Sequence, residues 1–216
     1  MKFSEIQILT HTLEAQRAFY TQTLGLPDAT TTPDTFTAQA GATRLTFAQA
    51  PANWKGVYHF AFNIPENQLA EAKVWLRQRT PLISSHAGED EYNFESWNAH
   101  AMYFFDPAGN VVELIARHNL PNASPRPFGS HSLLNVSEIS VTAAAVPDTA
   151  RAIQATLGVE VYDGPSATFA ALGDEHGLFI VVKEGREWFP DTGVWAGFYP
   201  MTARLEDGRI WVAPLS

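Results

Sequence analysis

Three side chains, Glu5, His59 and Glu113, have the chemistry to hold a divalent metal ion together. Each stands beside the apolar residues of a different expected strand. One imidazole and two carboxylates supply three ligand atoms and leave coordination positions open for a substrate. The two carboxylates favour Mn²⁺ or Mg²⁺, and the imidazole admits Zn²⁺, Ni²⁺ or Fe²⁺.

An open cation of this kind acts as a Lewis acid on a substrate with two adjacent oxygens, and stabilises an enolate or alkoxide. The non-haem iron oxygenases need two histidines and one carboxylate. Because Glu5 breaks that pattern, ring cleavage ranks below lyase, isomerase or transferase chemistry. Structural roles stay open for these residues: Glu113 as a strand-start hydrogen-bond partner and His59 as a satisfied buried histidine.

The segments around these residues predict strands and helices in a repeated order. Alternation predicts a strand at 58–64, with Phe60 and Phe62 on one face and His59, Ala61 and Asn63 on the other. The same kind of pattern places strands at 4–9, 35–39 and 43–48, helices at about 12–24 and 67–79, and a strand, turn and strand over 101–116. The order is therefore β-α-β-β, twice.

The beginning of the chain recurs 133 positions later. Ser4-Glu5-Ile6 returns as Ser137-Glu138-Ile139, and Thr23-Leu24-Gly25 returns as Thr156-Leu157-Gly158. We therefore predict a third unit at about 136–184, whose helix starts at an Asp148 N-cap. Because this unit has no counterpart of His59 or Glu113, the repeated Ser-Glu-Ile favours a structural role in both places. The tail, 185–216, has one hairpin signal at 205–210 and no convincing fourth unit.

Such units cannot bury their sheets alone, and two of them side by side close a curved sheet with helices outside and a ligand inside. We predict an α+β fold of paired βαβββ modules: residues 1–118 as a two-module domain, 119–135 as a linker with three prolines, and 136–216 as an additional half module with a tail. The third unit covers its sheet by packing on the first domain or by pairing across a homodimer. The helix-facing side takes Ile6, Ile8, Phe60, Phe62, Met102, Phe104, Val112 and Leu114.

Three motifs resemble those of the vicinal oxygen chelate superfamily, which includes glyoxalase I, fosfomycin and bleomycin resistance proteins, and extradiol dioxygenases. They are Ala18-Phe19-Tyr20 to Leu24-Gly25, His59-Phe60-Ala61-Phe62, and Tyr103-Phe104-Phe105-Asp106-Pro107-Ala108-Gly109-Asn110 leading into Glu113. The resemblance covers residues 1–118. It implies a glyoxalase-like fold, metal ligands at Glu5, His59 and Glu113, and a catalytic role for Glu113. Family members usually carry His or Gln where Glu5 stands.

The expected concave face also supplies pocket-lining candidates. They are Gln7, Phe47, Asn63, Tyr103, Phe105, Trp97 and His100. Strict alternation turns His100 away from the pocket unless a bulge intervenes. The preferred function is a metal-dependent glyoxalase-like lyase, isomerase or transferase acting on a small oxygenated molecule. The alternative is a metal-free protein that sequesters a small molecule, as bleomycin-resistance proteins do, and a ring-cleaving dioxygenase comes third.

Charge and composition exclude other classes of function. The formal net charge of −9 offers no basic surface for nucleic acid or acidic lipid. The absence of cysteine excludes disulfide scaffolds, Cys-based metal sites and thiol nucleophiles. No apolar run reaches the ~18 residues of a membrane span, and the first residues lack a secretory signal pattern. We therefore expect a cytoplasmic protein with a small-molecule partner.

Overall fold

The first repeat unit forms one side of the molecule. A computed structural model describes residues 1–213 of the 216-residue chain. The unit consists of β1 (Phe3–Thr10), α1 (Leu13–Ala18) continued by the π-helical turn η1 (Phe19–Thr23), β2 (Asp28–Thr31), β3 (Thr35–Ala40) and β4 (Thr43–Gln49). These bounds confirm the predicted strands at 4–9, 35–39 and 43–48.

The second and third units repeat this plan, and a hairpin ends the described chain. The second unit holds β5 (His59–Ile64), α2 (Leu69–Arg77), β6 (Tyr92–Phe94), the 3₁₀ turn η2 (Glu95–Trp97), β7 (Ala99–Phe105) and β8 (Val111–Arg117). After the 3₁₀ turn η3 (Ser130–Ser132), the third unit holds β9 (Asn135–Ala143), α3 (Val146–Leu157), β10 (Val161–Asp163), β11 (Phe169–Asp174) and β12 (Gly177–Lys183). The hairpin is β13 (Met201–Leu205) and β14 (Ile210–Ala213), at the predicted turn.

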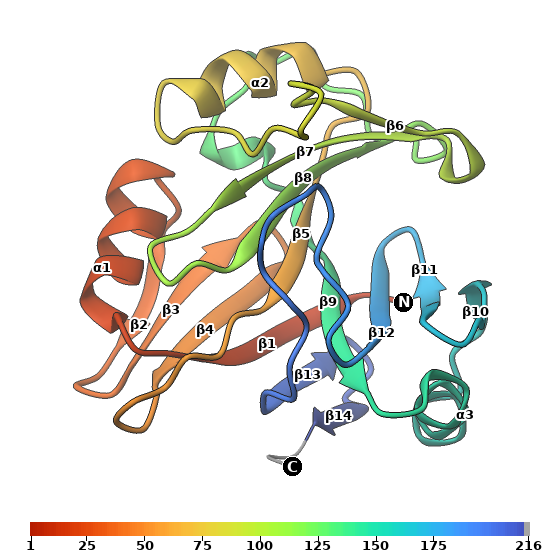
Figure 1. The fold of residues 1–216 in the computed structure, drawn as a ribbon. Coiled ribbons are helices and arrows are strands. Elements are labelled where there is room, and N and C mark those ends of the chain that lie inside the picture. The colour runs from red at the N-terminus through yellow and green to blue at the C-terminus, as the bar shows by residue number, and fades with distance from the viewer. Residues whose placement is uncertain (214–216) are drawn as a thin grey trace.

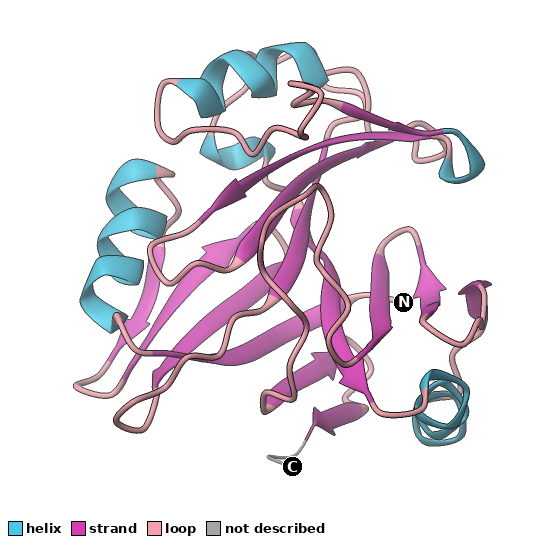
Figure 2. Ribbon diagram, viewed as in Figure 1, coloured by secondary structure: helices cyan, strands magenta, loops and turns pink. Residues whose placement is uncertain are grey.

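The strands form two curved sheets, as the α+β prediction requires (Figure 1). The eight-stranded sheet has the order β10-β11-β12-β9-β5-β8-β7-β6, and the six-stranded sheet has the order β14-β13-β1-β4-β3-β2. The helices lie on the outer sides of the sheets (Figure 2).

The pairing of the units differs from the prediction. Strand β5 lies antiparallel to β9, with Phe60 opposite Ile139, so the second and third units share one sheet. Strand β1 lies antiparallel to β13, so the hairpin completes the sheet of the first unit. The two units of residues 1–118 therefore do not share a sheet. The first strand of each unit has one hydrogen-bonding edge that its own unit leaves free. Alternation in the sequence does not indicate which other strand pairs with that edge. The sequence predicts that the third unit is covered either within the chain or across a homodimer, and the structure shows coverage within the chain.

The two faces of the eight-stranded sheet follow the predicted alternation. Phe60, Phe62 and Ile64 belong to the large core cluster, together with the other predicted helix-facing residues. Ala61 and Tyr103 belong to a second, smaller cluster on the opposite face. The side chains that alternate with the core are therefore gathered on one surface.

The third helix starts earlier than predicted. Helix α3 begins at Val146, with extended Ala145 as its N-cap residue and Pro147 in its first turn. Asp148 lies inside this turn and pairs with Arg151 instead of capping the helix. Proline suits the first turn because its missing N–H has no partner there anyway. None of the helices within residues 1–213 combines the length and the apolar character that a membrane crossing requires.

Candidate metal centre

The strand register aligns two carboxylates on the inner face of the eight-stranded sheet. Four paired residues form a row across the strands β7, β8, β5 and β9. Glu113 of β8 lies between Tyr103 of β7 and Ala61 of β5. Ala61 in turn pairs with Glu138 of β9. Residues paired in this way point to the same face of a sheet. Because Ala61 is small, the two glutamate side chains can meet above it.

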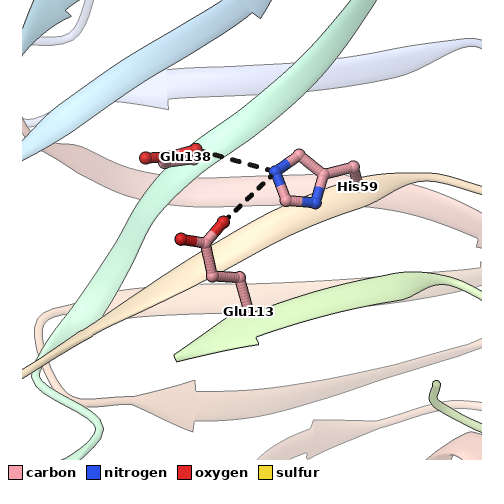
Figure 3. Close-up of side chains that lie close together, drawn as sticks. All are labelled: His59, Glu113 and Glu138. Carbon is pink, nitrogen blue, oxygen red and sulfur yellow. Dashed lines mark ion pairs between the residues drawn. The ribbon is translucent and has the colours of Figure 1, made fainter. Parts of the chain in front are cut away.

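His59, two positions before Ala61 on β5, completes a three-residue cluster (Figure 3). Its Nε2 atom lies 3.6 Å from Glu113 Oε2 and 3.6 Å from Glu138 Oε2. All three side chains are buried. Two ligand atoms that each bind a cation at about 2.1 Å can lie up to about 4.2 Å apart. The two distances from His59 Nε2 therefore fit a shared cation, and the ligand atoms of all three residues lie within 4.8 Å of one another.

The tautomer of His59 also fits a metal ligand. Its Nδ1 lies 3.0 Å from the carbonyl oxygen of Val111, which can only accept, so Nδ1 carries the proton and donates it. Nε2 is the ring atom that faces the two carboxylate oxygens, where it donates to them if the ring is protonated and can bind a cation if the ring is neutral. A backbone carbonyl on the far nitrogen is the usual device that orients a ligating imidazole. The ring also packs against Trp188, with ring centroids 5.0 Å apart.

Burial and like charge perturb the acids of this cluster. Burial, and secondly the charge of Glu138, raise the pKa of Glu113 well above its usual range, although Arg117 opposes the shift. Burial and the neighbouring Glu113 also raise the pKa of Tyr103. Without a cation, Glu113 keeps its proton to a higher pH than an exposed glutamate, and Tyr103 stays neutral.

A buried arginine holds Glu138. Arg117, at the end of β8, is fully buried and its guanidinium pairs with Glu138 Oε1. Its Nε donates to Asn63 Oδ1 at 3.2 Å. Glu138 therefore has one oxygen fixed by Arg117 and turns the other, Oε2, toward His59.

A cavity of about 300 Å³ opens above the three ligand atoms. This is the lower end of the range for small-molecule sites, so it fits a small substrate. The segment between β12 and β13 contributes Arg186, Glu187, Trp188 and Phe189 to the wall of this cavity. The remaining lining comes from the sheet and its turns: Phe94, Ser96, Trp97, Tyr103, Ile115, Asp163, Phe169, Ile180 and Val182.

The expected ligand Glu5 lies elsewhere. It is part of β1 in the six-stranded sheet, where its carboxylate lies 3.9 Å from Arg204 Nε and 3.4 Å from Thr46 Oγ1. The structure therefore corrects the proposed trio: it brings His59 and Glu113 together with Glu138. The physical reason is the partner of β5, which is β9 and not β1.

Two of the predicted pocket residues, Tyr103 and Trp97, line the cavity. The other five lie outside its lining. Gln7 is exposed on the six-stranded sheet, Phe47 is stacked on Phe36 in the core, and Phe105 is exposed at the end of β7. His100 is hydrogen-bonded to His118 away from the cavity, as strict alternation predicts, and Asn63 lies behind the site on Arg117.

The residues that the sequence analysis missed had one usable signal. Glu138 repeats Glu5 at the offset of 133, so the third unit offered an equivalent carboxylate. Arg117 and Trp188 carried no such signal, because an arginine at the end of a strand and a tryptophan in a tail are usually surface and core residues.

Comparisons with known proteins show the fold. No family model and no curated protein matches the chain. A "putative dioxygenase" from Bacillus subtilis matches 84% of the chain at TM-score 0.61 and 17% identity, and glyoxalase I from Zea mays matches 84% at TM-score 0.54 and 15% identity. The match covers 63% and 66% of those two longer chains. The chain therefore has the fold of these two structures, which is the glyoxalase-like fold that its motifs predict.

Proposed function

We propose that this chain, which has the vicinal oxygen chelate fold, is a metal-dependent enzyme that acts on a small oxygenated molecule. One observation carries the proposal: His59, Glu113 and Glu138 reach from three neighbouring strands and bring three buried ligand atoms within 4.8 Å of one another. Two buried carboxylates side by side are costly unless a proton or a cation lies between them.

The donor set fits a divalent cation. One imidazole nitrogen and two carboxylate oxygens suit Mn²⁺, Zn²⁺, Ni²⁺ and Fe²⁺, and Mg²⁺ less well because it prefers oxygen alone. Ile180 lines the cavity on β12, the strand on the other side of β9. This apolar residue supports a site with three protein ligands and coordination positions open toward the cavity.

The bound cation supplies Lewis-acid polarisation of a substrate carbonyl or hydroxyl. Glu113 is the residue we propose to move the proton, because it lines the cavity and can accept a proton on the carboxylate oxygen that does not face His59. Tyr103, which stays neutral beside it, can donate a hydrogen bond to the reacting oxygen. Trp188 packs on His59 and keeps water from its ring. These roles support lyase, isomerase or transferase chemistry in which a proton leaves a carbon next to a carbonyl.

A metal-free binding protein is the second candidate, and the cavity wall favours it. Six aromatic side chains line the cavity: Phe94, Trp97, Tyr103, Phe169, Trp188 and Phe189. Aromatic walls of this kind bind planar apolar compounds without any metal. Ring cleavage stays third, because the cluster has one histidine where the iron oxygenases have two.

Metal titration of purified protein tests the proposal. Protein freed of metal is titrated with Mn²⁺ and Zn²⁺ by calorimetry, as wild type, Glu138→Gln and Glu5→Gln. Glu5 is the matched control because it repeats Glu138 and lies in the other sheet. We expect one site per chain in the wild type and in Glu5→Gln, with at least a hundredfold weaker binding in Glu138→Gln. No titration by the wild type would favour the metal-free alternative, and equal titration of both variants would contradict the assignment of Glu138 as a ligand.

Self-association stays a prediction. The second and third units share one sheet, so the third unit needs no partner chain to cover it. Other surfaces remain available for a homodimer, and cytoplasmic location is also still an expectation. Light scattering of the full chain measures the oligomeric state, and a monodisperse monomer would end the dimer prediction.

A further inference from the structure

Arg117 is a buried cation next to the candidate metal centre, and the proposed chemistry does not use it. Its side chain is fully buried, and it approaches the face of the Trp97 ring at 5.5 Å. Its polar contacts are Glu138 and Asn63. Because a guanidinium does not lose its proton in a protein, this positive charge is permanent.

The floor of the cavity, formed by His59, Glu113, Glu138 and the neighbouring Arg117, has a net charge that follows from its residues. Bound ligands must be deprotonated, so Glu113 and Glu138 contribute two negative charges and His59 none. Arg117 contributes one positive charge and a divalent cation contributes two. The floor therefore carries one net positive charge when the cation is bound, and the other charged lining residues, Asp163, Arg186 and Glu187, lie exposed at the mouth.

We propose that Arg117 sets the charge of the substrate: it makes the loaded site bind an oxygen chelate as a monoanion. A net charge held among apolar walls is unfavourable until an opposite charge joins it. Ile115, Ile180 and Val182 form such walls here. One anionic oxygen brings the floor to neutrality, so a ligand that loses one proton on binding fits best. This inference rests on the proposed metal centre.

Arg117 also acts as a positioning residue for Glu138. It engages Oε1 of that carboxylate, which leaves Oε2 as the atom directed at His59. Glu138 then fills one coordination position and not two, and a substrate with two oxygens finds room. The Asn63 hydrogen bond fixes the guanidinium from behind.

Calorimetry with benzohydroxamic acid on Zn²⁺-loaded protein tests the inference. This probe is uncharged in water at neutral pH and binds metals through two oxygens as a monoanion. Titration in two buffers of different ionisation enthalpy measures the protons released. We expect about one proton for the wild type. Arg117→Met is expected to weaken binding by about 10- to 100-fold, the effect of one nearby charge in a protein interior, and to suppress proton release.

A second comparison covers the case in which Arg117→Met does not fold because Glu138 is left buried and unpaired. Glu138→Gln alone raises the net charge of the loaded floor by one, and Arg117→Met with Glu138→Gln restores it. At Zn²⁺ concentrations that load both proteins, we expect the single variant to bind the hydroxamate at least tenfold more tightly than the double variant. Arg117→Lys, which keeps the charge, should keep the release of one proton.

The two failures can be told apart. If the wild type binds no Zn²⁺, the proposed function falls and this inference falls with it. If Zn²⁺ binds, but affinity and proton release do not depend on the charge at position 117, the metal centre stands and the role of Arg117 is overturned.

Discussion

Removal of the Glu138 carboxylate should remove most of the stabilisation that metal gives the protein. A ligand at one hundred times its Kd stabilises the folded state by about 2.7 kcal/mol. For a chain of this size, 1 kcal/mol corresponds to about 2–4 °C in Tm, so the wild type should gain about 5–11 °C. Loss of one of the three ligands weakens binding by at least about a hundredfold, since even outer-shell partners are worth 10- to 100-fold. At the same Mn²⁺ concentration, Glu138→Gln should then gain only about 1 °C.

Differential scanning fluorimetry with and without Mn²⁺ measures these shifts. Glu5→Gln serves as the control and should match the wild type, because Glu5 lies on β1 in the other sheet with Arg204 and Thr46 as its neighbours. The reasoning is refuted if Glu138→Gln and the wild type gain the same number of degrees. It is also refuted if Glu5→Gln loses the gain, because the cation would then lie in the six-stranded sheet.

Three further changes probe other parts of the structure. Burial raises the pKa of Glu113, so its protonation stabilises the folded state fully below the unfolded pKa of about 4.5, and this stability is lost as pH rises through the raised folded pKa. The Tm of metal-free protein should therefore fall over that pH window. Glu113→Gln should make the fall in Tm with pH less steep. Trp188→Ala removes the ring that packs on His59 and should lower the free energy of unfolding in urea by about 3 kcal/mol. Asp106→Ala removes the buried acceptor of Gln16 and Tyr20 and should cost about 3 kcal/mol or more, with Mn²⁺ affinity at low temperature unchanged.

Much of the fold follows from local patterns. The alternation over 58–64 assigns Phe60 to the core and His59 to the opposite face, and the structure has them there. The Asp106 turn follows from its residue types, because Asp106 accepts from the backbone N–H groups of Ala108 and Asn110. Such features depend on neighbours in the chain, so a single sequence contains the information.

The composition of the candidate site depends on pairing between distant strands. His59 and Glu113 lie in one unit, whose parallel β5–β8 pairing brings them together. The third member depends on which strand joins the free edge of β5, and both Glu5 and Glu138 follow a serine at the same repeat position. Hydrophobic alternation is equal for the two strands and cannot choose between them. The choice is made by long-range edge pairing and by the hairpin that occupies the edge of β1.

The most direct test of the metal centre is an anomalous difference map from crystals grown with Mn²⁺ and measured at the manganese absorption edge. The account predicts one peak per chain at about 2.0–2.3 Å from His59 Nε2 and from one oxygen each of Glu113 and Glu138. A map without a peak at that point, or with its peak beside Glu5, would contradict it.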